Sequence, residues 1–128
     1  MMVTALYASL LAVIFVGMSL HVIRNRWRAG KSLGDGGDKG LRAAIRAHGN
    51  FAEYVPFSLV MMGLVEGGGG PDALVHGLGI AVVLSRALHA WGLMGHRGPN
   101  KARSIGMTLT FGVLLVAAGA LLRQLALS

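Results

Sequence analysis

The sequence predicts an all-α integral membrane protein, folded as a bundle of four transmembrane helices. Its composition is 54% hydrophobic and only 13% charged, whereas soluble domains carry about 25% charged residues. The apolar residues form long runs, and most of the basic residues lie in the segments between those runs. A chain of 128 residues has the size of one domain. We therefore expect a single four-helix membrane domain over residues 1–128.

The first helix is expected over residues 2–23. The segment from Met1 to Ile23 contains no Asp, Glu, Lys or Arg, and about 20 apolar residues in a helix cross the hydrocarbon core of a bilayer. A cleavable signal peptide would carry its basic residues before the apolar run. Here Arg24, Arg26, Arg28 and Lys31 follow the run instead. We interpret the segment as a retained transmembrane helix.

Three further helices are expected over residues 41–65, 72–95 and 104–122. The last of these is uncharged throughout. The two middle segments are long enough to span but contain charged residues, which mark them as the helices that carry the chemistry. The connectors are short and rich in glycine, for example Gly67–Gly70. Short connectors place successive helices side by side, as in a four-helix bundle.

Loop charges predict the orientation in the membrane. Segments 24–40 and 96–103 are basic, whereas the segment around Glu66 and Asp72 has no Lys or Arg. The positive-inside rule then places loops 24–40 and 96–103 in the cytoplasm and both termini on the opposite side. Topology thus accounts for the net charge of +7, and no nucleic-acid partner is expected. The chain has no cysteine, so any sulfur chemistry must come from a bound molecule.

A polar stripe runs along the second predicted helix. Arg42, Arg46, Asn50 and Glu53 are spaced by four, four and three residues, which places them on one helix face. An ionisable residue at membrane depth costs about 2.5–3.5 kcal/mol, so this face cannot point at lipid. Pro56 removes one helical hydrogen bond and is expected to kink the helix just past Glu53.

The third predicted helix adds Arg86 and His89 at similar depth. A structural interpretation is that Glu53 and Arg86 form a buried ion pair between the two helices. That pair would leave Arg42, Arg46, His89 and Arg103 without an acid, and a surplus of arginine suits a ligand with carboxylates. The histidines lack the spacing and the acidic third ligand of a metal site, so no metal is expected.

The segment Arg46-Ala47-His48-Gly49-Asn50-Phe51-Ala52-Glu53-Tyr54-Val55-Pro56, followed by Arg86 and His89, resembles the membrane-associated proteins in eicosanoid and glutathione metabolism, the MAPEG family. The connector Gly34-Asp35-Gly36-Gly37 is similar to that of the small bacterial members, which implies a bacterial inner membrane. The resemblance implies a homotrimer of four-helix subunits that binds glutathione between neighbouring protomers. Glutathione is then the co-substrate, and the other partners are membrane lipids and a lipophilic small molecule.

The resemblance also implies roles for individual residues. Arg103 corresponds to the catalytic arginine near the glutathione sulfur, with Lys101 as the alternative position. Glu53 would take the glutamyl ammonium group. Leu93 stands where eicosanoid-processing relatives have a tyrosine that contacts glutathione. The implied glutathione contacts are Arg46, His48, Asn50, Glu53, Tyr54, Arg86 and His89.

The function expected from these residues is that of a glutathione transferase or peroxidase acting on lipophilic electrophiles or lipid hydroperoxides. One alternative is a non-catalytic membrane protein of the same fold, in which the polar residues persist for packing. A second alternative is a small proton-coupled multidrug exporter that uses Glu53. Arginines around Glu53 argue against the exporter, because they would repel a cationic drug.

Overall fold

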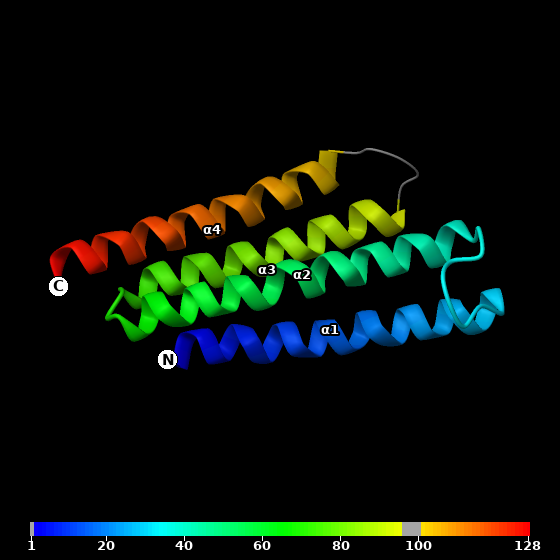
Figure 1. The fold of residues 1–128 in the computed structure, drawn as a ribbon, viewed down its shortest axis with the longest axis horizontal. Coiled ribbons are helices and arrows are strands. Elements are labelled where there is room, and N and C mark those ends of the chain that lie inside the picture. The colour runs from blue at the N-terminus through cyan, green and yellow to red at the C-terminus, as the bar shows by residue number, and fades with distance from the viewer. Residues whose placement is uncertain (1, 96–100) are drawn as a thin grey trace.

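The computed structural model describes residues 2–95 and 101–128, which form four helices and no strand. The helices are α1 (Met2–Ala29), α2 (Lys39–Gly67), α3 (Asp72–Gly95) and α4 (Lys101–Leu127). They run side by side along one long axis, and both termini lie at the same end of the bundle (Figure 1). The predicted four-helix fold is confirmed.

The helices extend beyond the uncharged runs that predicted them. Helix α1 continues to Ala29, and α4 begins at Lys101. Basic residues in the last turn of α1, Arg26 and Arg28, are compatible with a helix because cations interact favourably with the negative end of its dipole. The membrane-spanning run and the helix are therefore not the same length.

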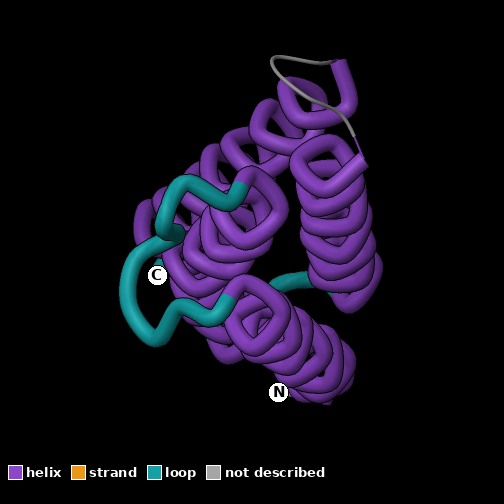
Figure 2. Tube along the Cα trace, turned by 90° about the vertical axis from the view of Figure 1, so that its right-hand side faces the viewer, coloured by secondary structure: helices purple, strands orange, loops and turns teal. Residues whose placement is uncertain are grey.

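Three of the four helices, α1, α3 and α4, are long and apolar enough to cross a membrane. Helix α2 carries the charged residues of the stripe and lies among the other three helices. It packs against α1, α3 and α4, whereas α1 and α4 do not touch each other within the described residues. The end-on view of Figure 2 shows this arrangement. The polar residues of α2 therefore have helical neighbours on several sides.

The connector between α1 and α2 is held by two arginine–aspartate pairs. Asp38 caps α2 by accepting a hydrogen bond from the backbone N–H of Leu41 at 2.7 Å, and Arg28 donates to the same oxygen at 2.9 Å. Arg42 pairs with Asp35. The hydrogen bond from Arg42 lowers the pKa of Asp35 to about 2.

Glu66, at the other end of α2, caps the first turn of α1. Its two carboxylate oxygens accept hydrogen bonds from the backbone N–H groups of Val3 at 2.9 Å and Thr4 at 2.8 Å. The first N–H groups of a helix have no partner within the helix, and a negative charge there is favourable. The start of α1 is thus stabilised by a residue from the following helix.

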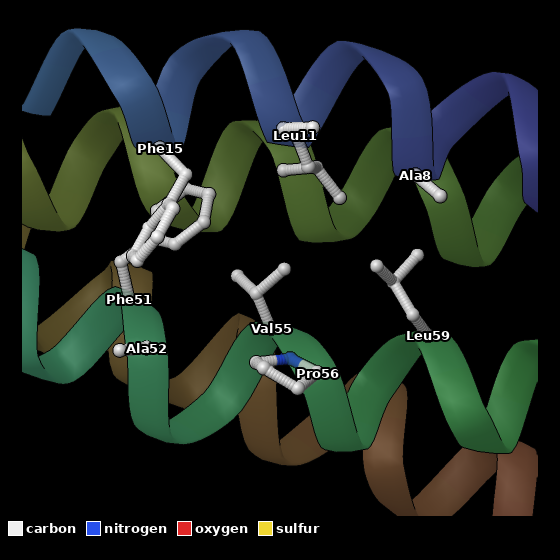
Figure 3. A pocket seen from close by; sticks show the side chains of 9 residues that line it. Ala8, Leu11, Phe15, Phe51, Ala52, Val55, Pro56 and Leu59 are labelled. Atoms are coloured by element: carbon white, nitrogen blue, oxygen red, sulfur yellow. The ribbon is translucent and has the colours of Figure 1, made fainter.

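An apolar groove of about 390 Å³ lies between α1 and α2 (Figure 3). Phe15 stacks on Phe51 at its one end, with 5.6 Å between the ring centroids. Pro56 lies along its α2 wall and leaves the carbonyl of Ala52 without its helical donor. The lining residues are Ala8, Leu11, Ala12, Phe15, Phe51, Ala52, Val55, Pro56 and Leu59.

Candidate anion-binding site

Arg86 is the centre of the polar cluster. Its side chain comes from α3, is only 3% exposed, and donates from Nε to Ser85 Oγ at 3.2 Å. Its two terminal nitrogens donate to Asn50 Oδ1 on α2 and to Thr110 Oγ1 on α4. The guanidinium carbon also lies 5.8 Å from the ring centroid of Tyr54, a cation–π distance. One side chain therefore joins α2, α3 and α4.

The suggested ion pair between Glu53 and Arg86 is wrong. Arg86 reaches Asn50 instead, while the side chain of Glu53 is exposed on the face of α2 that the chain leaves uncovered. Within residues 2–95 and 101–128, no carboxylate pairs with Arg86. Its charge is therefore balanced only by the dipoles of neutral groups and by the face of the Tyr54 ring.

His89 lies one turn further along α3 and is 4% exposed. Its Nδ1 atom is buried and has no hydrogen-bond partner among the described residues. The backbone of Arg103 lies within hydrogen-bonding reach of the ring. The positive charges of Arg86, Arg103 and Arg46 are close enough to interact electrostatically with the ring. The fold thus brings together four of the residues that the sequence analysis singled out.

Gly106 allows α4 to approach this part of α3 closely. A β-carbon at Gly106 would lie 2.7 Å from the carbonyl oxygen of Ser85 and 2.9 Å from the backbone nitrogen of His89. Real β-carbons essentially never come under 3.0 Å of such atoms. The glycine therefore fixes the distance at which Arg103, one turn earlier on α4, stands from His89.

Arg46 and Glu53 lie on an exposed face of α2. The same face carries Phe57, Val60 and Leu64, which are each more than half exposed. Arg42 begins the stripe, but it pairs with Asp35 and is therefore not available to a ligand. The stripe therefore leaves one arginine and one glutamate at membrane depth on a surface that this chain does not cover.

His48 does not join the cluster. Its Nε2 atom lies 2.9 Å from Ser19 Oγ, and its ring stacks on Phe15 with 4.7 Å between centroids. The reason is rotation along the helix: at about 100° per residue, His48 lies roughly 200° from Asn50 and faces α1. The expected contact of His48 with the ligand is not supported by this placement.

Two residues of the cluster were missed from the sequence, and both come from α4. Thr110 accepts from Arg86 and gives its own proton to the carbonyl of Gly106 at 2.9 Å. Met107 Sδ accepts from Asn50 Nδ2 at 3.5 Å. A signal was available, because small polar residues in membrane helices often form hydrogen bonds between helices, and Thr110 stands four residues after Gly106.

Two sequence observations have a limited structural counterpart. Leu93 is half-buried on α3, where it offers no hydrogen bond to a ligand. The loop 96–103, which the charge pattern places in the cytoplasm, falls largely on residues 96–100, which lie outside the described residues. Lys101 and Arg103 both belong to the first turn of α4. Of these two, Arg103 is the one that interacts electrostatically with His89.

The arrangement can attract an anion. A buried guanidinium without a carboxylate leaves a positive charge in a medium of low dielectric constant, where an opposite charge is bound more strongly than in water. Arg46 extends this positive region to the surface of α2. Glu53, about 10 Å deeper than Arg46 along the helix axis, adds a place for an ammonium group.

These features define a helical integral membrane protein with a polar site between its helices. The sequence model of the MAPEG family matches residues 4–123. The inner membrane protein YecN of Escherichia coli K12 is 38% identical over 115 residues, which cover 90% of this chain and 86% of that protein. The protein of the same name from Escherichia coli O6:H1 matches to the same extent. No solved structure matches the chain.

The chain belongs to the MAPEG family. The family prediction from the segment Arg46–Pro56 is thereby confirmed. With three membrane-capable helices and relatives that are inner membrane proteins, the chain is an integral inner-membrane protein, as the resemblance implied.

Proposed function

We propose that this protein binds glutathione and uses it as a transferase or peroxidase on lipophilic electrophiles or lipid hydroperoxides. The observation that carries the proposal is the buried Arg86, which has no carboxylate partner within the described residues, beside Arg46 and Arg103. Membership of the MAPEG family supports the same proposal. Glutathione has two carboxylates and one ammonium group, which matches a cluster of arginines with a single glutamate.

The residues divide into those that contact the ligand and those that hold them. Arg46 and Arg103 are exposed and can bind carboxylates through the planar fork of the guanidinium. Glu53 takes the glutamyl ammonium. Asn50 and Tyr54 are half-buried at the edge of the cluster, where both can offer a hydrogen bond. Arg86 acts mainly through Asn50 and Tyr54, because its own side chain is buried.

The chemical task is activation of the glutathione thiol. A thiol with a pKa near 8.5 is only a few per cent ionised at neutral pH, and the thiolate is the nucleophile. A cation within about 4–6 Å can lower such a pKa by one to three units. Arg103 supplies that cation. The thiolate then forms a carbon–sulfur bond with an electrophile, which expels its leaving group or takes up a proton after addition. With a hydroperoxide, the thiolate attacks the terminal oxygen, the O–O bond breaks, and the alcohol leaves after taking up a proton. A second glutathione reduces the resulting sulfenic acid and gives glutathione disulfide and water.

The uncovered face of α2 supports contact with further copies of the chain, and the resemblance to the family gives the proposed number of three. Arg46 and Glu53 lie on this face, and each charge facing lipid would cost about 2.5–3.5 kcal/mol. A neighbouring copy of the chain that covers the face removes this cost and closes the ligand site from the second side. Phe57, Val60 and Leu64 provide an apolar contact for that copy.

Isothermal calorimetry of glutathione on the detergent-purified protein tests the proposal. The wild type is expected to bind saturably, and Arg46→Ala to lose most of the binding. Arg123→Ala, an exposed arginine at the far end of α4, is the matched control and should bind as the wild type does. Absence of binding up to several millimolar glutathione would eliminate the glutathione assignment.

A second candidate function is non-catalytic. The three side chains that accept from Arg86 hold it within one chain, which favours a structural role for this arginine. Leu93 also lacks the hydroxyl that eicosanoid-processing relatives offer. Saturable glutathione binding without turnover on a panel of electrophiles and hydroperoxides would favour this second function.

A further inference from the structure

The end of α1 carries a second basic region, separate from the cluster around Arg86. A hollow of about 580 Å³ opens there between the last turns of α1 and the start of the connector. Ile23, Trp27 and Gly30 lie along one face of α1, at spacings of four and three residues. Arg26, Lys31 and Ser32 complete the lining.

The hollow combines apolar and cationic walls. Trp27 is 82% exposed and Ile23 is 42% exposed. An exposed apolar surface therefore continues from Ile23, at the end of the uncharged segment, to Trp27 at the membrane interface. Tryptophan is enriched at this depth because its ring is amphipathic. Arg26 lies between Ile23 and Trp27 in the chain, and Lys31 follows them; both line the same hollow. A ligand with an anionic head and apolar chains matches both walls.

Arg26 is held in place by hydrogen bonds, and the stem of Lys31 lies beside the connector. Arg26 Nη1 donates to the carbonyls of Ser32 at 3.2 Å and Gly34 at 3.0 Å, which folds the connector back over the helix end. The stem of Lys31 lies across Gly36, where a β-carbon would be 2.5–2.9 Å from the Cγ, Cδ and Cε atoms of Lys31. The hydrogen bonds of Arg26 leave its side chain little freedom to lose when an anion binds.

No acid of the connector neutralises these two cations. Asp35 pairs with Arg42, and Asp38 pairs with Arg28. Arg26 and Lys31 are therefore free of carboxylate partners within the part of the chain that the structure describes. A positive charge beside an exposed indole at the membrane interface suits the phosphate of a lipid headgroup.

We propose that this hollow binds an anionic phospholipid, with its phosphate between Arg26 and Lys31 and its acyl chains along Ile23 and Trp27. The site is independent of glutathione and would hold whatever the protein does with the cluster around Arg86. Zwitterionic lipid fits less well, because its amine adds a positive charge beside two others.

Trp27 provides a direct readout. The chain has two tryptophans, so Trp91→Phe leaves Trp27 as the sole fluorophore. Phosphatidylglycerol with brominated acyl chains, titrated into the detergent-purified protein, should quench Trp27 at a roughly 25-fold lower mole fraction than brominated phosphatidylethanolamine does, because each of the two basic residues strengthens anionic-lipid binding about fivefold.

Charge variants locate the effect. Lys31→Gln leaves the hydrogen bonds of Arg26 intact and should lower the preference about fivefold, whereas Arg26→Gln/Lys31→Gln should abolish it. Lys39→Gln/Arg123→Gln removes the same amount of charge from exposed positions outside the hollow and should keep the preference. Circular dichroism checks that each variant is folded.

Three results would overturn the proposal. Equal quenching by the two lipids would show that the hollow does not select anions. An equal loss of preference in the control double variant would assign the effect to net charge. Reversal of the quenching by a few millimolar inorganic phosphate, but not by chloride at the same ionic strength, would assign the site to free phosphate.

Discussion

Gly106 lies so close to Ser85 that a β-carbon at Gly106 would stand 2.7 Å from the Ser85 carbonyl oxygen. We expect Gly106→Ala to push α4 away from α3 and to destabilise the protein by about 1–3 kcal/mol, as overpacking does. Thermal unfolding in detergent measures this change. Gly112→Ala, on the same helix with nothing within 4 Å of the added carbon, is the control and should be neutral or slightly stabilising.

Arg86 is expected to couple the contributions of Asn50 on α2 and Thr110 on α4 to stability, because it forms hydrogen bonds with both. Thr110→Val removes an acceptor of the buried guanidinium and should cost about 1.5–3 kcal/mol, the range for hydrogen bonds to charged groups. Thr108→Val, exposed two residues earlier on α4, should be nearly neutral. A double-mutant cycle of Thr110→Val with Asn50→Ala should be non-additive, because both partners hold the same side chain. Strict additivity would contradict the shared junction.

Arg103 is expected to affect the ionisation of the glutathione thiol more than the affinity for glutathione. Arg103→Ala should lower turnover more than affinity and raise the midpoint of the pH–rate profile by one unit or more, because the thiolate loses its cation. Arg103→Lys should restore part of the shift. Lys101→Ala, on the same first turn, should leave the profile in place. A shift with Lys101→Ala instead would transfer the role to that residue.

The oligomeric contact can be tested with single cysteines, since the chain has none of its own. Val60→Cys lies on the uncovered face of α2 and should form disulfide-linked pairs of chains in native membranes under mild oxidation. Leu115→Cys, 73% exposed on α4, is the control for random encounters. Equal cross-linking at the two positions would count against a contact through α2.

The connector is expected to be sensitive to strong acid only. Because the pKa of Asp35 falls from 3.8 to about 2 through its hydrogen bond with Arg42, the folded connector favours the carboxylate. Its contribution to stability is complete above about pH 4 and is lost as the pH falls towards 2. NMR titration of the Asp35 carboxyl measures the midpoint. Arg42→Gln should move it back towards the ordinary value, and an unchanged midpoint would contradict the pairing.

The sequence predicted the order and approximate positions of the helices, because a long apolar run is visible in the sequence without knowledge of which residues meet in the fold. It underestimated their ends. Uncharged residues mark what crosses the hydrocarbon, whereas Arg26 and Arg28 at the end of α1 remain helical outside it. Pairings between helices were harder. Arg86 donates to Asn50 and not to Glu53. These two residues lie three positions apart on α2, so the partner depends on how α2 is rotated about its axis. The spacing of residues within one helix does not determine that rotation.

Sequence reasoning singled out the polar residues of the cluster on α2 and α3 and missed Thr110 and Met107 on α4. Arg46, Asn50, Arg86 and His89 carry charge or polarity that is conspicuous in an apolar segment. Thr110 is inconspicuous there, because a hydroxyl in a helix can form a hydrogen bond with its own backbone. Its contact with Arg86 became evident only once Gly106 had set the distance between α3 and α4.

The cap that Glu66 forms on α1 has a consequence for how the chain is made. Sixty-three residues separate Val3 from the carboxylate that receives its N–H, so the first helix leaves the ribosome before its cap has been synthesised. The N-terminal amides of α1 acquire this partner only when the end of α2 arrives beside them. Biogenesis therefore completes the first two helices together as a hairpin, and a stalled chain that ends before residue 66 would present a first helix with a frayed beginning.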